Sequence, residues 1–139
     1  MYKILLATHG ELGKGLKNTL GMFTGELEDV HYVSLDESGV ENFKDALISK
    51  MEEIYVEGEE VLVLADLFGG TPFNTATVEL KAKYAGVEII AGVNLPVLLE
   101  ATLMREMNIS DIIDGLLEGG VNSIKKFELP KTSNNEDDE

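Results

Sequence analysis

The 139-residue sequence contains no cysteine, which excludes disulfide bonds, thiolate metal sites and a cysteine nucleophile. The same absence is compatible with a reducing compartment. No apolar run approaches the roughly 18 residues that a membrane-spanning helix requires. The first residues, MYKILLATHGE, lack the pattern of a signal peptide. We therefore expect a cytoplasmic protein that does not insert into a membrane.

Basic residues are also scarce, because 11 lysines and arginines stand against 26 aspartates and glutamates, a net charge of −15. Such a surface repels the phosphate backbone of nucleic acids, so no nucleic acid partner is expected. Residues 128–139 are polar and hold five of the acids against one lysine. The composition predicts a single domain over residues 1–127, followed by an acidic, disordered tail over residues 128–139.

Short apolar runs alternate with segments of helical period along the chain. The runs cover residues 2–7, 30–35, 60–65 and 87–92, and a helical segment follows each of them. Strands that alternate with helices are typical of an α/β fold, and uninterrupted apolar strands fit a sheet covered on both faces. We predict a three-layer α/β/α domain with a mainly parallel sheet in the strand order 2-1-3-4, plus a possible antiparallel edge strand at residues 125–129.

The predicted helices show cap and face signals. Thr71 precedes Pro72, and because proline is favoured at the first helical position, Thr71 is predicted to cap that helix. Ser110 is predicted to cap the last helix. The apolar residues of the first helical segment recur at helical spacing and are Leu12, Leu16, Leu20 and Phe23.

One of only two histidines directly follows the first strand. Ligands of an open parallel sheet bind beyond the carboxyl ends of the strands, where the strand order reverses. With the order 2-1-3-4, His9 and Asp66 face each other across that crevice. Each has an ordinary interpretation as a turn residue, and His31 is interpreted as a partly exposed strand residue. A carboxylate at one ring nitrogen would fix the tautomer and leave the other nitrogen free to attack, so their coincidence favours a nucleophilic histidine.

A segment suited to phosphate follows Asp66. The backbone N–H groups of Gly69, Gly70 and Thr71, together with the start of the following helix, are predicted to bind a phosphoryl group. The Thr71 hydroxyl would donate one more hydrogen bond. Asn94, in the loop after the fourth strand, would lie beside the same site. This arrangement suits a histidine that accepts a phosphoryl group and passes it on.

Other kinds of site fit the sequence less well. The stretch GELGKGLKN matches neither the P-loop nor the dinucleotide fingerprint. A phosphoaspartate site would need an acidic pair for magnesium after the first strand, where Thr8 and His9 stand instead. His9 and Asp66 are too few ligands for a convincing metal site, which leaves a metalloenzyme as a distant alternative. We predict no metal and no cofactor.

Three ordered segments, LLATHGELGKGL, VLVLADLFGGTPFNTA and IIAGVNLPVLLEA, resemble the IIA domain of the mannose/fructose/sorbose family of the bacterial sugar phosphotransferase system. The resemblance covers about residues 1–126. It implies a protein-histidine phosphotransferase whose histidine, here His9, accepts a phosphoryl group from the carrier HPr and passes it to a IIB partner. The sugar, of the mannose type, is then phosphorylated during uptake through membrane components IIC and IID. The orienting aspartate of the family corresponds to Asp66 and its hydroxylated residue to Thr71.

The resemblance also implies an assembly. Members form homodimers in which a C-terminal strand can be exchanged, and residues 123–129 are the candidate here. The IIB partner would be a separate protein. Two alternatives remain at this point: a regulatory module read through its phosphorylation state, and the phosphotransferase subunit of dihydroxyacetone kinase. In the latter, serine tends to follow the histidine, whereas this chain has Gly10, which favours sugar transport.

Overall fold

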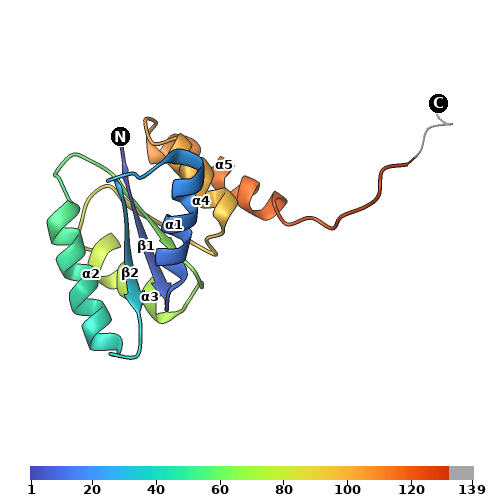
Figure 1. The fold of residues 1–139 in the computed structure, drawn as a ribbon. Coiled ribbons are helices and arrows are strands. Elements are labelled where there is room, and N and C mark those ends of the chain that lie inside the picture. Colours follow the sequence, from blue (N-terminus) through green and yellow to red (C-terminus); the bar gives the residue numbers. More distant parts are fainter. Residues whose placement is uncertain (132–139) are drawn as a thin grey trace.

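The computed structural model describes residues 1–131, so residues 132–139 lie outside it. Strands and helices alternate along the chain (Figure 1). The elements are β1 (Lys3–His9), α1 (Leu12–Thr24), β2 (Val30–Leu35), α2 (Val40–Ile54), β3 (Val61–Ala65), α3 (Thr71–Ala76), the π-helical turn η1 (Thr77–Lys81), β4 (Val87–Ala91), α4 (Leu95–Leu103) and α5 (Ile109–Asn122).

The four strands form one parallel sheet in the order β2-β1-β3-β4, which confirms the predicted fold class and strand order. All five residues of β3 are buried, as expected for a strand with helices on both faces. The chain runs outward from β1 to β2 and then crosses back to β3. The carboxyl ends of β1 and β3 are therefore neighbours at the point where the strand order reverses, which is where such sheets bind ligands.

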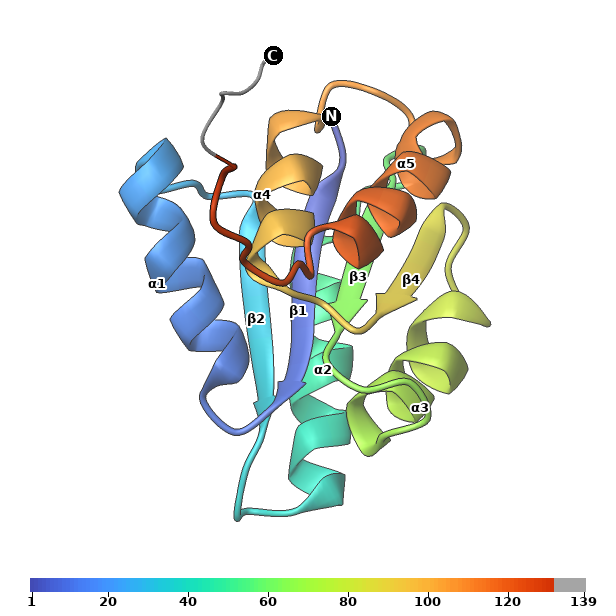
Figure 2. The same cartoon turned by 90° about the vertical axis from the view of Figure 1, so that its right-hand side faces the viewer.

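Successive residues of β1 point to opposite faces of the sheet. Ile4 and Leu6 belong to the apolar cluster that also holds residues of α1, α4 and α5, whereas Leu5 and Ala7 belong to the cluster with α2 and α3. Figure 2 shows α1, α4 and α5 in front of the sheet and α2 and α3 behind it. The same alternation directs Thr8 towards α1 and His9 towards α3.

Two of the predicted helix caps are wrong by one or two positions. The N-cap of α3 is Gly70, and Thr71 is already the first helical residue. The N-cap of α5 is Asn108, not Ser110. Neither cap residue makes a side-chain cap hydrogen bond. The first residue of α5, Ile109, is fully buried, and in α3 the buried Pro72 directly follows Thr71.

The apolar face of α1 also differs from the predicted one. Leu20 and Gly13 are buried and Leu16 is partly buried, but Leu12 and Phe23 are exposed. The helix packs on the sheet along a line through Gly13 because that residue has no side chain to hold α1 away from β1. As a result, Leu12 lies on the surface close in sequence to His9.

The predicted edge strand at residues 125–129 does not form a strand in the single chain. Ile124, Phe127 and Leu129 are exposed there. Residues 128–131 have no regular secondary structure, and the rest of the predicted tail lies outside the described residues. Within residues 1–131, none of the helices combines the length and apolar character needed to cross a bilayer.

The contact between α4 and α5 depends on a glycine, which gives a stability prediction. A Cβ at Gly120 would overlap Cγ2 of Val97, whereas a Cβ at Gly115 would meet no atom. We expect Gly120→Ala to lower the free energy of unfolding by about 1–3 kcal/mol through overpacking. Gly115→Ala, on the exposed side of the same helix, should raise it by about 0.5–1 kcal/mol. Urea denaturation of both variants measures this, and equal shifts in the two would contradict it.

Candidate functional site

His9 is the last residue of β1 and lies where the chain turns into α1. It pairs with Leu35 of β2, and the backbone N–H of Gly10 donates to the Leu35 carbonyl at 2.7 Å. Gly10 has a φ of +56°, in the left-handed region that favours glycine. Gly10 therefore lets the chain leave the sheet immediately after His9, which holds the imidazole at the carboxyl edge.

Asp66 follows β3 and contacts His9 across the crevice. Its Oδ2 accepts hydrogen bonds from the backbone N–H of His9 at 2.9 Å and from ring Nδ1 at 3.0 Å. Its Oδ1 accepts from the backbone N–H of Leu67 at 3.0 Å. An ionised carboxylate only accepts hydrogen bonds, so Nδ1 carries the ring hydrogen and Nε2 keeps its lone pair. The structure thus brings together the two residues that the strand order had paired.

The ionisation of Asp66 follows from its surroundings. Its side chain is only 10% exposed, and this partial burial acts to raise its pKa. The hydrogen bonds from the His9 backbone and ring, with the positive charge that the ring carries when protonated, outweigh that effect and bring the pKa of Asp66 below its ordinary value. Asp66 is therefore an anion at neutral pH and able to stabilise positive charge on the imidazole.

Gly69 and Gly70 form a tight turn against the ring. Gly69 has a φ of +81°, and the backbone N–H of Gly70 donates to the Leu67 carbonyl at 3.1 Å. A Cβ at Gly70 would lie 3.1 Å from Cε1 of His9. Glycine at position 70 therefore permits close approach of the start of α3 to the imidazole. The predicted contact from the Gly70 N–H to a phosphoryl group competes with the hydrogen bond that the turn already uses.

Asn94 is used within the fold. Its Oδ1 accepts from the backbone N–H of Val97 at 3.0 Å and so caps α4. Its Nδ2 donates to the Gly120 carbonyl and to Oγ of Ser123, both at 3.3 Å. Because both ends of this amide have partners, Asn94 ties the loop after β4 to the end of α5. This role was not evident from its place after the fourth strand.

The site opens onto an exposed, partly apolar surface that the sequence analysis did not single out. The His9 side chain is 43% exposed. Leu67 and Phe68, directly after Asp66, are exposed, Phe68 by 83%, and the Phe68 ring lies against that of Phe73 with centroids 4.7 Å apart. In the sequence, the feature that could have indicated this surface is the apolar pair Leu67 and Phe68 inside a glycine-rich turn. Exposed aromatic and aliphatic side chains beside a reactive group are typical of a protein–protein contact surface.

His31, the other histidine, lies in a different setting in β2. Its partial burial, followed by the positive charges of Lys50 and Lys17, lowers its pKa.

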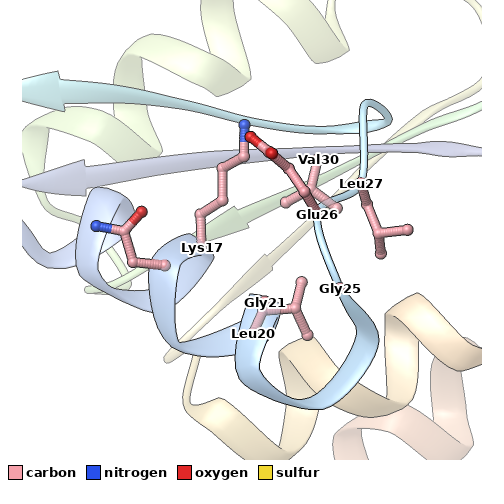
Figure 3. Close-up of a pocket in the computed structure, with 8 residues that line it drawn as sticks. Lys17, Leu20, Gly21, Gly25, Glu26, Leu27 and Val30 are labelled. Atoms are coloured by element: carbon pink, nitrogen blue, oxygen red, sulfur yellow. The ribbon is translucent and has the colours of Figure 1, made fainter.

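A nearby cavity of about 230 Å³ between α1 and the start of β2 is drawn in Figure 3, where Lys17 and Glu26 reach over it. No predicted site residue lines this cavity. Within residues 1–131, there is no cluster of three or more side chains suited to a metal ion.

The chain is similar over most of its length to known proteins. The family model described as PTS system fructose IIA component matches residues 3–116. The fructose-specific EIIA component of Bacillus subtilis (strain 168) is 33% identical over 118 residues, which are 84% of this chain and 80% of that protein. The sorbose-specific EIIA component of Lacticaseibacillus casei is 30% identical over 118 residues, 84% of this chain and 83% of that protein.

A solved structure gives the same picture in three dimensions. The mannose/sorbose specific IIA subunit of the phosphotransferase system from Enterococcus faecalis has a TM-score of 0.84 and 30% sequence identity, over 94% of this chain and 98% of that chain. With a family model that covers most of the domain and relatives that agree along it, the chain belongs to the IIA components of the mannose/fructose/sorbose family of the sugar phosphotransferase system.

Proposed function

We propose that this protein is a cytoplasmic phosphocarrier. It accepts a phosphoryl group from the phosphohistidine of HPr on Nε2 of His9 and passes it to a IIB partner. Through membrane components IIC and IID, this transfer supports the uptake and phosphorylation of a sugar of the mannose type. The observation that carries the proposal is the Asp66–Nδ1 hydrogen bond, because it leaves Nε2 as the nucleophilic nitrogen of an exposed ring.

The chemistry needs only groups on the two proteins. The lone pair of Nε2 attacks phosphorus in line as the N–P bond of the donor histidine breaks, and the donor nitrogen takes back the bonding pair. The His9 ring then carries phosphorus on Nε2 and hydrogen on Nδ1, and is cationic. The Asp66 carboxylate stabilises that charge without moving. Transfer to IIB is the same step in reverse, with the IIB side chain as nucleophile.

In this proposal the phosphoryl oxygens lie against the start of α3. The Thr71 hydroxyl is not required as a helix cap, because Gly70 takes that position, so it is assigned to the phosphoryl group. Gly69 shapes the turn, and Gly70 allows close approach of the backbone. Asn94 has a structural role in this proposal, since its amide is hydrogen-bonded to α4 and α5. Leu67 and Phe68 would contact HPr and IIB in turn.

The test is phosphoryl uptake by the full chain. Incubation with phosphoenolpyruvate, enzyme I and HPr should add one acid-labile phosphoryl group, measured by intact mass before and after acid treatment. Absence of uptake would contradict the proposal. Addition of a IIB protein should then remove the group. If the group is taken up but no IIB protein removes it, the regulatory alternative is favoured over transport.

Gly70 gives a second prediction at the same site. In Gly70→Ala, the new methyl group would press on Cε1 of His9 and lengthen the Nδ1–Asp66 hydrogen bond. We expect the rate of phosphoryl uptake to fall roughly tenfold, since small displacements of reacting groups are costly. Gly21→Ala in α1, where a Cβ meets no atom, is the control and should react at the normal rate. Equal rates in both variants would show that Gly70 does not set the ring position.

We also propose a homodimer in which residues 123–129 are exchanged. The support is twofold. First, the apolar side chains of Ile124, Phe127 and Leu129 are exposed in the single chain. Second, β4 is an edge strand beside an apolar groove of about 220 Å³ that includes Ile90, Leu117 and Val121. Sedimentation of the full chain should give a dimer, and a chain ending at Asn122 should dissociate. A monomeric full chain, or a dimer unaffected by truncation, would contradict the exchange.

A further inference from the structure

Thr8, the residue before His9, is a fully buried polar side chain that the proposed reaction does not use. Its Oγ1 accepts a hydrogen bond from the backbone N–H of Gly13 at 2.8 Å. Gly13 lies in the first turn of α1, where backbone N–H groups have no acceptor within the helix. The N-cap residue of α1, Glu11, makes no side-chain cap hydrogen bond. Thr8 therefore caps α1 from the end of the neighbouring strand.

This hydrogen bond depends on glycine at position 13. A Cβ there would lie 2.9 Å from Oγ1 of Thr8 and 3.4 Å from the Cβ atoms of both Leu6 and Tyr32. Any side chain would force α1 away from β1 and β2. Thr8 and Gly13 thus depend on each other. The Gly13 N–H needs the Thr8 hydroxyl as its acceptor, and the hydroxyl can approach this closely because residue 13 has no side chain.

The contact lies on the face of the sheet opposite the His9 ring. Thr8 points to the side of α1, whereas His9 points to the side of α3, where Gly70 meets its ring. The peptide unit that joins Thr8 to His9 is therefore held from two directions. Towards α1, the Thr8 side chain is bonded to Gly13, and towards the end of β3, the His9 N–H is bonded to Asp66.

We propose that Thr8 is a positioning residue for His9, an inference that rests on the proposed phosphocarrier function. Its hydroxyl fixes the direction in which β1 ends, and so fixes the imidazole relative to Asp66. Without the hydroxyl, the Gly13 N–H would be buried without an acceptor, and the first turn of α1 would shift to reach water. Because only Gly10 and Glu11 separate His9 from α1, that shift reaches the ring.

The experiment compares three variants of the full chain. Thr8→Val keeps the shape of the side chain and removes the acceptor, and Thr8→Ser keeps the hydroxyl. Thr102→Val is the matched control, since Thr102 is also a buried threonine whose hydroxyl is hydrogen-bonded, to the Leu98 carbonyl at 2.8 Å, but in α4 and away from His9. Urea denaturation measures the loss of stability in Thr8→Val and Thr102→Val, so that a change in rate can be compared with the change in stability of each variant.

The first readout is the tautomer of the His9 ring, from long-range ¹H–¹⁵N spectra, with the ring of His31 as an internal reference. The second is the rate of phosphoryl uptake from phosphorylated HPr. In Thr8→Val we expect a smaller fraction of the Nδ1–H tautomer at His9, unchanged His31 signals and a rate roughly tenfold lower. Thr8→Ser and Thr102→Val should each stay within about twofold of the original rate.

The proposal is overturned if Thr8→Val keeps both the His9 tautomer and the uptake rate, because Thr8 would then contribute to stability alone. If Thr8→Val does not fold, Gly13→Ala attacks the same hydrogen bond from the helix side and must show the same two changes. The outcomes remain separable from the phosphocarrier proposal. If the original chain takes up no phosphoryl group, that proposal fails, while the tautomer comparison still decides whether Thr8 positions the ring.

Discussion

His9→Gln is expected to take up no phosphoryl group from phosphorylated HPr, while His31→Gln takes it up at the normal rate. Glutamine is close to histidine in size, and the backbone N–H of residue 9, which the substitution leaves in place, can still donate to Oδ2 of Asp66. The amide has no nucleophilic lone pair corresponding to Nε2, so the turn is preserved while the acceptor nitrogen is lost. We expect no phosphorylated His9→Gln protein above the detection limit of the measurement.

The measurement is intact mass after incubation with phosphoenolpyruvate, enzyme I and HPr, with circular dichroism as the check on folding. His31 is the appropriate control because it is the only other histidine and lies in β2, on an element that does not carry the site. Uptake by His9→Gln would refute the assignment of the acceptor. Loss of uptake in His31→Gln alone would move the assignment to β2.

Asp66→Asn is expected to slow phosphoryl uptake on the order of 10²- to 10⁴-fold, up to the effect of about 10⁴-fold that follows when the orienting aspartate beside a catalytic histidine is made neutral. Both oxygens of Asp66 face donors: Oδ1 the Leu67 N–H, and Oδ2 the N–H and Nδ1 of His9. Asparagine has one oxygen, so at least one of these donors would face an NH₂ group. If that donor is Nδ1, the ring changes tautomer and Nε2 loses its lone pair. In either orientation the charge that stabilises the phosphorylated ring is gone.

Asp36→Asn is the matched control for this substitution. Asp36 follows β2 at the same edge of the sheet as Asp66 follows β3, but its carboxylate accepts hydrogen bonds from the backbone and hydroxyl of Ser38. Rapid-quench kinetics with phosphorylated HPr should show the original rate for Asp36→Asn. Equal rates for the two variants would remove the orienting role of Asp66, and a loss of Nδ1–H signal at His9 in Asp66→Asn would support it.

Much of the fold of this protein, and the position of its candidate site, can be predicted from the sequence. Uninterrupted apolar strands such as VLVLA, alternating with helical segments, lead to a parallel sheet covered on both faces. The carboxyl ends of adjacent parallel strands share one edge, so a histidine after β1 and an aspartate after β3 become neighbours once the order 2-1-3-4 holds. Hydrophobic period and chain direction are enough for that inference, because both are local properties of the chain.

What the sequence alone determined is therefore the fold class, the edge of the sheet that carries the candidate site and the pairing of His9 with Asp66. Tertiary structure decided which atoms of the site are already engaged. It placed Gly70 against the ring, directed the Gly70 N–H to Leu67 and the Asn94 amide to α4 and α5, and joined Thr8 to Gly13. The physical reason is that periodicity specifies a face or an edge, whereas a hydrogen bond depends on separations of a few tenths of an ångström, which arise only when distant elements pack together.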